Sequence, residues 1–326
     1  MSYRCSIYGL GVIANRPIPG VPPSAIVSED VRLSFGSLPA WLNDVTATQI
    51  ETSYVAEYKS ECGEPALRVF RVLDGNYYRF YYADQTEFLI DRSGTEVWAQ
   101  WSTPLTIEDT ATYLLGPVMG FVMLLRGIVC LHASAIVVDD EAVALLGSAG
   151  SGKSTTAAAF STRGYSILAE DVVTLDDRGD HFLVRPGYPC IRLWPASVKA
   201  LYGSETYLPK LTPNWEKCYL DLKHQFHGDA LPLAAIYHLG ERRHEATAPF
   251  VETLGPAEGL LSLIANTYAT KLMNKAMRAR EFELLTRVLN NVPLRRVTPH
   301  ADPARISELC DRILTDFQRG YSRVNV

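Results

Sequence analysis

The sequence lacks the cysteine patterns that mark disulfide frameworks and zinc sites. Such sites need Cys and His ligands at close, regular spacings. The six cysteines form no C-x-x-C pair and no cluster with histidines: they are Cys5, Cys62, Cys130, Cys190, Cys218 and Cys310. We therefore predict free, reduced thiols, as is usual for proteins of the cytoplasm.

The sequence also lacks an uninterrupted apolar run and an excess of basic residues. An apolar stretch over 113–130 is broken by glycines, a proline and Arg126, and its apolar part is shorter than the roughly 20 residues that span a bilayer. The first residues carry no apolar run of signal-peptide type. Basic residues number 31 against 36 acidic ones, for a net charge of -5, whereas nucleic-acid-binding proteins are usually basic. We expect a cytoplasmic protein with no membrane and no nucleic-acid partner.

The composition is that of a globular protein, with 47% hydrophobic and 21% charged residues among 326. A chain of this length predicts roughly two domains. Residues 1–105 are expected to form a β-rich N-terminal domain. Short runs rich in Val, Phe, Tyr and Trp alternate there with turn residues, as in a meander of hairpins; they cover 66–73, 76–82, 87–90 and 95–101.

The middle of the chain, 106–250, predicts an α/β core. Thr106 is a suitable cap for a helix that continues toward residue 125. Apolar strands are expected at 132–138 and 142–146, then a glycine-rich loop, a helix that ends near Gly164, and a strand at 166–169. Further strands are expected at 182–185, 217–222 and 233–239.

The last part of the chain, 251–326, is expected to be helical. Apolar residues recur at helical spacing over 257–273, 281–289 and 303–317. Asp302 and Pro303 are a good cap and first residue for the last of these helices. Its predicted buried stripe consists of Ile306, Leu309, Ile313 and Phe317.

The strongest motif is a glycine-rich phosphate loop that matches G-x-x-x-x-G-K-[ST] at every fixed position. An apolar strand precedes it and a helix follows, so backbone N–H groups and the helix N-terminus can bind phosphate. Lys153 is expected to reach the β- and γ-phosphates of ATP, and the Ser154 hydroxyl to bind Mg²⁺. The predicted nucleotide-binding residues are Gly147, Ser148, Ala149, Gly150, Ser151, Gly152, Lys153, Ser154 and Thr155.

An acidic pair, Glu170 and Asp171, follows Lys153 by 17 and 18 residues. That interval accommodates one helix and one buried strand, so both carboxylates are expected at the phosphate site. One would hold Mg²⁺ and the other would accept a hydroxyl proton. His132 opens the strand predicted to pair with the strand before the loop, which would bring it to the same place.

Other residues have both a binding and a structural interpretation. Lys271, Lys275 and Arg278 would share one helix face if the helix continued, but a solvated face is the more common reason for such a pattern. Arg192 and Lys217 lie in segments of the α/β core and are better candidates for phosphate contacts. The tyrosine-rich segment 77–82 could form a peptide-binding strand edge, although a packed sheet face is favoured.

Three short runs taken together resemble the catalytic core of the bacterial HPr kinase/phosphorylase family. They read HASAI at 132–136, GSAGSGKS at 147–154 and AEDVV at 169–173. The resemblance covers about residues 131–175 and implies a fold related to phosphoenolpyruvate carboxykinase, the use of ATP and Mg²⁺, and phosphorylation of a protein serine. The β-rich N-terminal part differs from the family, and the chain looks more like the HPr-kinase-like enzymes of lasso-peptide gene clusters. Those enzymes phosphorylate a precursor peptide, typically at a C-terminal serine.

The resemblance implies roles for the matched residues. Lys153 and Ser154 would bind phosphates and Mg²⁺, Asp171 would be a metal ligand, Glu170 would be the general base, and His132 would join the site. Glu170 stands where the family has aspartate, and the R-G-L-G-type signature that follows the pair is replaced by 185–195, which leaves phosphorylase activity open.

The leading hypothesis is therefore an ATP- and Mg²⁺-dependent serine kinase with a peptide or protein substrate. Alternatives are a small-molecule kinase of the shikimate or gluconate type, HPr(Ser) kinase proper, and a nucleotide-binding regulatory module without chemistry. The intact Lys153, Ser154 and acidic pair argue against the last. A homo-oligomer, the acceptor, and the division of roles between Glu170 and Asp171 are left open by the sequence.

Overall fold

A computed structural model describes residues 2–25 and 28–324, with the side chains from 321 onward left out. The chain forms two compact units. The first comprises the chain up to Ile128 together with Thr212–Asn214 and Ala269–Met277. The second comprises Val129–Leu211, Trp215–Tyr268 and the chain from Arg278 onward.

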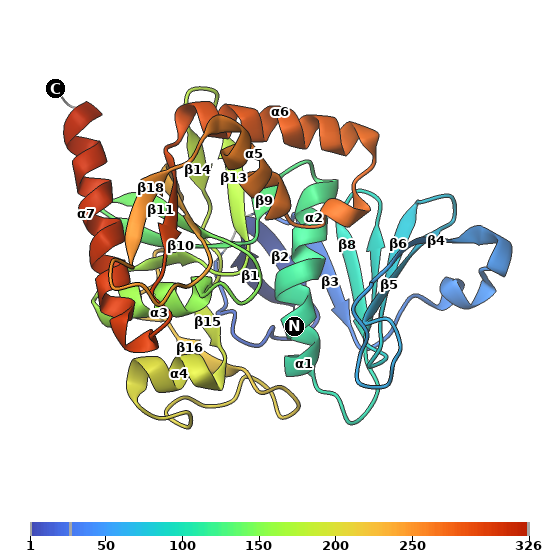
Figure 1. Cartoon of the computed structure of the whole chain (residues 1–326). Coiled ribbons are helices and arrows are strands. Elements are labelled where there is room, and N and C mark those ends of the chain that lie inside the picture. Colours follow the sequence, from blue (N-terminus) through green and yellow to red (C-terminus); the bar gives the residue numbers. More distant parts are fainter. Residues whose placement is uncertain (1, 26–27, 325–326) are drawn as a thin grey trace. The chain divides into compact units, whose positions relative to one another are not determined.

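In the described part of the first unit, eight strands form one sheet in the order β1-β2-β3-β8-β7-β6-β5-β4 (Figure 1). The strands are β1 (Tyr3–Ile7), β2 (Leu10–Ala14), β3 (Val31–Phe35), β4 (Ile50–Val55), β5 (Leu67–Val72), β6 (Tyr77–Tyr82), β7 (Glu87–Asp91) and β8 (Glu96–Gln100). The predicted meander is confirmed as the antiparallel run β5–β8. The strand β6 lies between β5 and β7, so the tyrosine-rich segment is a packed strand and not an edge for a peptide.

A helical segment packs on this sheet and explains where the unit ends. It consists of α1 (Ile107–Tyr113), a π-helical turn η3 (Leu114–Val118) and α2 (Met119–Leu125). Thr106 caps α1 as predicted, in a capping box with Asp109. The ring of Phe121 contacts Tyr78 and Phe80 of β6. Residues 106–128 therefore belong with the first sheet, whereas the sequence groups them with the α/β core.

Short 3-10 helices complete the first unit: η1 (Ala40–Asp44), η2 (Ala47–Gln49) and η4 (Thr270–Leu272). The last one corrects a prediction. The helix expected over 257–273 ends at Ala265, and the left-handed backbone of Ala269 (φ 57°) separates it from the helix that starts at Lys275. Lys271, Lys275 and Arg278 therefore do not share one helix face.

The second unit contains a mixed sheet whose described strands follow the order β12-β10-β11-β17-β14-β13-β9, with β19 and then β18 added beside β17. The strands are β9 (Val129–Leu131), β10 (Ala133–Val138), β11 (Glu141–Leu146), β12 (Ile167–Ala169), β13 (Val173–Asp177), β14 (Phe182–Val184), β17 (Leu231–Leu239), β18 (Phe250–Thr253) and β19 (Leu294–Thr298). Strands β11, β17 and β19 run parallel. A separate two-stranded sheet joins β15 (Cys190–Leu193) to β16 (Cys218–Asp221).

Helices cover both faces of this sheet. The elements are α3 (Lys153–Thr162), α4 (Pro195–Tyr202), α5 (Pro256–Ala265), α6 (Lys275–Asn291), η5 (Pro303–Arg305) and α7 (Ile306–Val324). Residues of α3, α4 and α7 form one apolar core with alternate residues of β10 and β11. Residues of α5 and α6 form a second core with the intervening residues of the same strands. Because successive side chains of a strand point to opposite faces of the sheet, β10 and β11 contribute to both cores.

The predicted stripe of α7 is confirmed: Leu309, Ile313 and Phe317 are buried, and Ile306 packs against them. The purely helical region expected for 251–326 is wrong, because β18 and β19 lie within it. β19 reads Leu-Arg-Arg-Val-Thr, and it is a strand because it pairs with β17 and β18. Such pairing with distant segments leaves little trace in a local apolar pattern.

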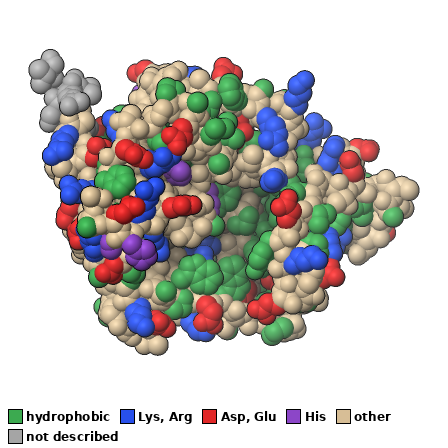
Figure 2. Space-filling view, in the orientation of Figure 1, with side chains coloured by type: hydrophobic (Ala, Val, Ile, Leu, Met, Phe, Trp, Pro, Cys, Tyr) green, Lys and Arg blue, Asp and Glu red, His purple; other side chains and the backbone are tan. Residues whose placement is uncertain are grey.

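The described cysteines are all free thiols, as predicted. No helix among residues 2–25 and 28–324 is long and apolar enough to cross a membrane. On the face shown in Figure 2, acidic and basic side chains are interspersed. This agrees with the nearly balanced charge of the sequence.

Candidate active site

The order and direction of the strands bring distant residues to one edge of the second sheet. The glycine-rich loop follows β11, and the acidic pair follows β12, which runs in the same direction because both strands pair antiparallel with β10. His132 immediately precedes β10 and therefore lies at the same edge. This is the hairpin arrangement that the sequence predicts for His132 and the loop.

The loop has the backbone conformation that its glycines allow. Gly147, Gly150 and Gly152 have φ of 151°, 81° and 105°, a region that side-chain-bearing residues rarely adopt. At Gly147 an added Cβ would lie 2.6 Å from the Ser151 Oγ and 3.0 Å from the Leu239 carbonyl oxygen. Only glycine fits there without displacing the loop.

Lys153 is buried at the start of α3 and is held by the loop itself. Its Nζ donates to the carbonyl oxygens of Gly147 at 2.8 Å and Ser148 at 3.1 Å. Burial lowers the pKa of Lys153, while the nearby carboxylates of Asp171 and Glu170 act in the opposite direction. The ammonium group is thus kept within the loop, close to both acids.

A tight turn directs two adjacent carboxylates to one place. The Val172 amide donates to the Glu170 carbonyl oxygen at 2.8 Å, and Asp171 between them has φ 68°. In an extended strand, neighbouring side chains point to opposite faces. The left-handed residue removes that alternation, at a conformational cost that is typical of functional sites.

Asp171 is held by three side chains. Arg192 Nη2 donates to its Oδ2 at 2.6 Å, and His132 Nε2 lies 3.3 Å from its Oδ1. The hydroxyl of Tyr268, whose ring also contacts His132, bonds to the same carboxylate. Burial alone would raise the pKa of Asp171, but the Arg192 guanidinium and His132 hold it well below its usual range. Asp171 is therefore an ionised and oriented carboxylate.

Glu170 has a different environment. Its Oε1 accepts a hydrogen bond from the Ser154 Oγ at 2.6 Å. Its Oε2 is buried and has no hydrogen-bond partner among the described residues, with Arg192 Nε 3.9 Å away. Burial and the adjacent Asp171 raise the pKa of Glu170. The serine of the loop thus contacts Glu170, whereas the family resemblance pairs the metal with Asp171.

These oxygens fit a magnesium ion. Mg²⁺ is usually held by one or two carboxylates together with substrate phosphates and water. The Ser154 hydroxyl and the open Oε2 of Glu170 are hard oxygen ligands of that kind. The described residues contain no cluster of three or more His, Cys, Asp or Glu side chains that would hold a metal by themselves.

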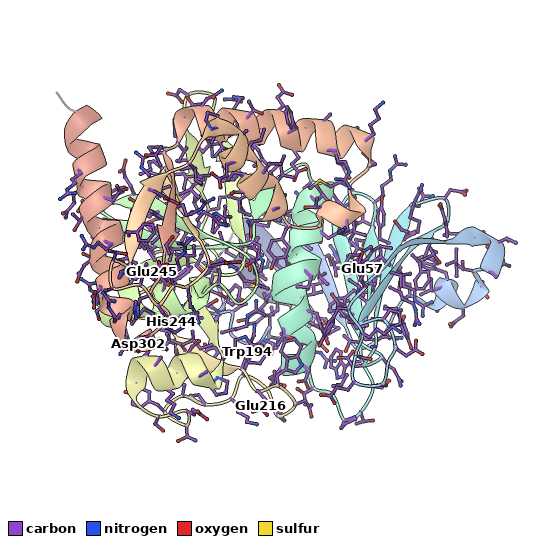
Figure 3. All side chains as sticks on the ribbon, viewed as in Figure 1. Glu57, Trp194, Glu216, His244, Glu245 and Asp302 are labelled. Carbon is purple, nitrogen blue, oxygen red and sulfur yellow. The ribbon has the colours of Figure 1, made fainter. Side chains whose placement is uncertain are left out.

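Other predicted residues have mixed outcomes. Thr155 directs its hydroxyl to the Ser197 Oγ at 2.8 Å. Lys217 acts electrostatically on both acids, and its Nζ lies over the ring of Trp194, 5.2 Å from the centroid. Trp194, at the junction of β15 and α4, is 55% exposed (Figure 3). Tyr268 and Trp194 are additions that the sequence did not predict, since no motif surrounds either residue.

Comparisons with known proteins add little to this geometry. No protein-family model matches the chain, and no curated protein matches its sequence significantly. Among solved structures, the HPr(Ser) kinase/phosphatase from Coxiella burnetii is similar to 60% of this chain and 96% of its own, with 14% sequence identity and a TM-score of 0.33. At that level of likeness, the assignment of a function depends on the residues of the site.

Proposed function

We propose that this protein is a kinase that transfers the γ-phosphoryl group of ATP to a serine hydroxyl of a peptide or protein. The observation that carries the proposal is the contact between the phosphate loop and an acidic pair. Ser154 bonds to Glu170, and the next residue, Asp171, is ionised and held by Arg192 and His132. A nucleotide-binding module without chemistry would have no need for this second, oriented carboxylate.

In this proposal the phosphates occupy the glycine-rich loop. Backbone N–H groups and the N-terminus of α3 bind the phosphate oxygens, and Lys153 neutralises charge on the β- and γ-phosphates. Ser154 and Glu170 hold Mg²⁺, which supplies neutralisation of the charge on the transferred group when it is bound. The Oε2 of Glu170, which has no hydrogen-bond partner among the described residues, supports the assignment of Glu170 as a metal ligand.

Asp171 would then face the acceptor. Its low pKa keeps it ionised at neutral pH, so it accepts a hydrogen bond from the acceptor hydroxyl and takes up the proton as the new P–O bond forms. Arg192, His132 and Tyr268 are positioning residues that fix the carboxylate. This division of roles is the reverse of the one that the family resemblance implies for Glu170 and Asp171.

The acceptor class rests on the resemblance of 131–175 to HPr kinases and to the homologues of lasso-peptide clusters. A polypeptide must be ordered on binding, which costs free energy and calls for contacts beyond the phosphoryl site. A chain with a second compact unit has surface available for such contacts. The acceptor to examine first is therefore the C-terminal serine of a short precursor peptide.

The test is transfer of ³²P from [γ-³²P]ATP to a panel of acceptors. The panel contains peptides with an internal or a C-terminal serine, the same peptides with Ser→Ala, and small alcohols such as shikimate and gluconate. We expect label on a serine peptide, located by mass spectrometry. In Lys153→Ala, transfer should fall on the order of 10²–10³-fold, because a preorganised charged donor is lost. Label on the small alcohols alone would replace this function with that of a small-molecule kinase.

A further inference from the structure

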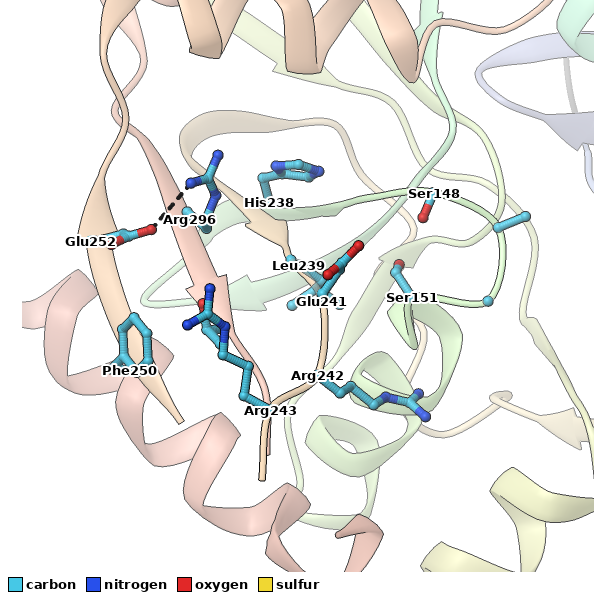
Figure 4. Close-up of a pocket in the computed structure, with 14 residues that line it drawn as sticks. Ser148, Ser151, His238, Leu239, Glu241, Arg242, Arg243, Phe250, Glu252 and Arg296 are labelled. Carbon is cyan, nitrogen blue, oxygen red and sulfur yellow. Dashed lines mark hydrogen bonds and ion pairs between the residues drawn. The ribbon is translucent and has the colours of Figure 1, made fainter. Parts of the chain in front are cut away.

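A cavity lies on the opposite side of the phosphate loop from the acidic pair. The sheet places β12 and β10 on one side of β11, and β17 and β19 on the other. The cavity has a volume of about 730 Å³ and is lined by the loop residues Ser148–Ser151 and by residues of β17, β18 and β19 with the segment after β17 (Figure 4). Ligand sites in proteins typically measure about 300–1,000 Å³.

The outer wall of the cavity is preformed. The segment after β17 is tied to the segment after β19, because the Arg243 amide donates to the Pro299 carbonyl oxygen at 2.9 Å and the Ala301 amide donates to the Arg243 carbonyl oxygen at 2.8 Å. Figure 3 shows the neighbouring His244, Glu245 and Asp302 gathered at this end of the sheet. A ligand would therefore enter a shaped site.

Two of the three arginines that line the cavity are paired with carboxylates. Arg296 pairs with Glu252 at 3.3 Å and also with Glu258, and Arg243 lies 3.7 Å from Glu245. A site for a second polyanion would instead present cations without acidic partners. The third lining arginine, Arg242, has no ion pair among the described residues and lies beside the loop, where its Nη2 is 3.0 Å from the place of an added Cβ on Gly152. The unpaired cation is thus at the loop end of the cavity, and the rest of the lining suits a neutral, polar ligand.

The remaining lining groups can recognise a flat heterocycle and hydroxyl groups. Phe250 offers a ring for stacking, and the Glu241 carboxylate, which has no ion pair among the described residues, offers acceptors. His238 lies on the same wall, where burial and Arg296 lower its pKa and keep it neutral. The Ser151 hydroxyl is buried and also lacks a hydrogen-bond partner among the described residues.

We propose that this cavity binds the base and ribose of the nucleoside triphosphate whose phosphates occupy the glycine-rich loop. The inference rests on the proposed function and assigns a subsite to it. The acidic pair marks the side of the loop at which the γ-phosphate is expected to lie. The nucleoside should therefore extend from the opposite side of the loop, where the cavity begins. A smaller cavity beyond Arg242, beside the first turn of α3, has only about 130 Å³ and is below the size of ligand sites.

Gly240 offers a way to fill the cavity without straining the backbone. It lines the cavity, its φ is not in the left-handed region, and an added Cβ would meet Arg296 and Val297 at 3.6 Å, which is ordinary contact. Gly240→Leu would therefore occupy the nucleoside site. Gly228→Leu is the matched control, because Gly228 is exposed, has open space around it and lies outside the cavity.

The experiment measures the affinity of the full chain for Mg·ATP and for Mg·tripolyphosphate, which carries the phosphates alone. We expect the unmodified protein to bind ATP more tightly, and Gly240→Leu to weaken ATP binding about tenfold or more, as loss of well-packed contacts does, while tripolyphosphate binding stays within about twofold. Gly228→Leu should change neither affinity. Glu241→Gln, which disturbs no ion pair, should weaken ATP binding by a smaller factor.

Two outcomes would overturn the inference: equal affinity of the unmodified protein for ATP and tripolyphosphate, or equal effects of Gly240→Leu on both ligands, including no effect on either. These outcomes are separate from failure of the proposed function. If ATP binds with the expected selectivity but no phosphoryl group reaches a serine, the subsite stands and the kinase assignment fails. If neither ligand binds, both proposals fail.

Discussion

Two of the buried glutamates, one in each compact unit, differ in how far neighbouring groups satisfy their carboxylates. Glu87 in β7 is 7% exposed and Glu170 after β12 is 4% exposed. Glu87 has both oxygens satisfied, one by Arg79 Nε at 2.7 Å and the other by Gln100 Nε2 at 3.3 Å. Glu170 has one oxygen satisfied by Ser154 and one without a hydrogen-bond partner among the described residues.

Burial of a charge is costly unless partners compensate it. In the first unit, compensation comes from adjacent strands of the same sheet: Gln100 lies directly opposite Glu87 in the pairing of β7 with β8. In the second unit, compensation is incomplete around the phosphate loop. An unpartnered oxygen alone does not mark a binding role, because Asp109 Oδ1 and Glu281 Oε1 are also buried without a hydrogen-bond partner among the described residues. The difference teaches that position matters as well: the unpartnered oxygen of Glu170 belongs to a carboxylate that contacts the glycine-rich loop through Ser154.

The largest effect is expected from replacing Glu170, whose carboxylate has one oxygen without a hydrogen-bond partner among the described residues. Glu170→Gln should reduce phosphoryl transfer on the order of 10²–10³-fold, as expected for one preorganised charged group, and should raise the Mg²⁺ concentration needed for activity. Folding should be little affected, since a neutral amide is cheaper to bury than a carboxylate. Transfer rates across a Mg²⁺ titration and thermal unfolding measure both effects.

Asp171→Asn is the matched variant for that experiment. It should slow transfer while leaving the Mg²⁺ dependence close to that of the unmodified protein, because Asp171 faces the acceptor in the proposed arrangement. A shift in Mg²⁺ dependence for Asp171→Asn but not for Glu170→Gln would restore the division of roles that the family resemblance implies.

Glu87→Gln should show the opposite behaviour. It leaves Arg79 without its carboxylate, and loss of a partly buried, charged hydrogen bond costs about 1–3 kcal/mol of the free energy of unfolding. Transfer by the folded protein should not change. Chemical denaturation followed by circular dichroism measures the loss. An unchanged midpoint would show that the hydrogen bonds of the Glu87 carboxylate do not stabilise the fold.

The smallest expected effect concerns the cap of α1. Thr106→Ala removes a side-chain cap and should cost about 1 kcal/mol of the free energy of unfolding. Burial alone would raise the pKa of the neighbouring Asp109, but hydrogen bonds from Thr212, Asn214 and Thr106 hold it below its usual value. Asp109 therefore stabilises the fold above the pKa of the unfolded chain, and this contribution is lost as the pH falls through its folded pKa.

Denaturation of Thr106→Ala at pH 7 and in acid measures this dependence. The difference from the unmodified protein should be largest at pH 7 and smaller in acid. A difference that grows as the pH falls would contradict the capping-box account.

The sequence predicts those parts of the molecule that short-range signals encode. The hairpins β5–β8 follow from aromatic and β-branched runs between turn residues. The strand, glycine loop and helix around Lys153 follow from a motif whose spacing is fixed by the geometry of phosphate binding. The position of His132 beside the loop follows from one hairpin. The nucleotide, the metal and the acceptor stay predictions.

Other parts depend on contacts between distant segments. β19 is a strand through its pairing with β17, and Tyr268 reaches Asp171 from beyond α5. The convergence of Asp171 with Glu170 at one site depends on a positive φ at Asp171, which no sequence rule specifies at that position. The place of α1 and α2 was misjudged because a helix can pack on the sheet before it as readily as on the sheet after it.

The left-handed turn at Asp171 has a consequence for how the protein can change over time. Because the two adjacent carboxylates share one site through that turn, a residue inserted between Glu170 and Asp171 would move Asp171 out of its place in the turn and away from Arg192 and His132. Insertions and deletions at this point would therefore separate the two acids at once, while substitutions would alter them one at a time. We expect length variation in this protein to accumulate in surface loops and to be absent between Ala169 and Val173.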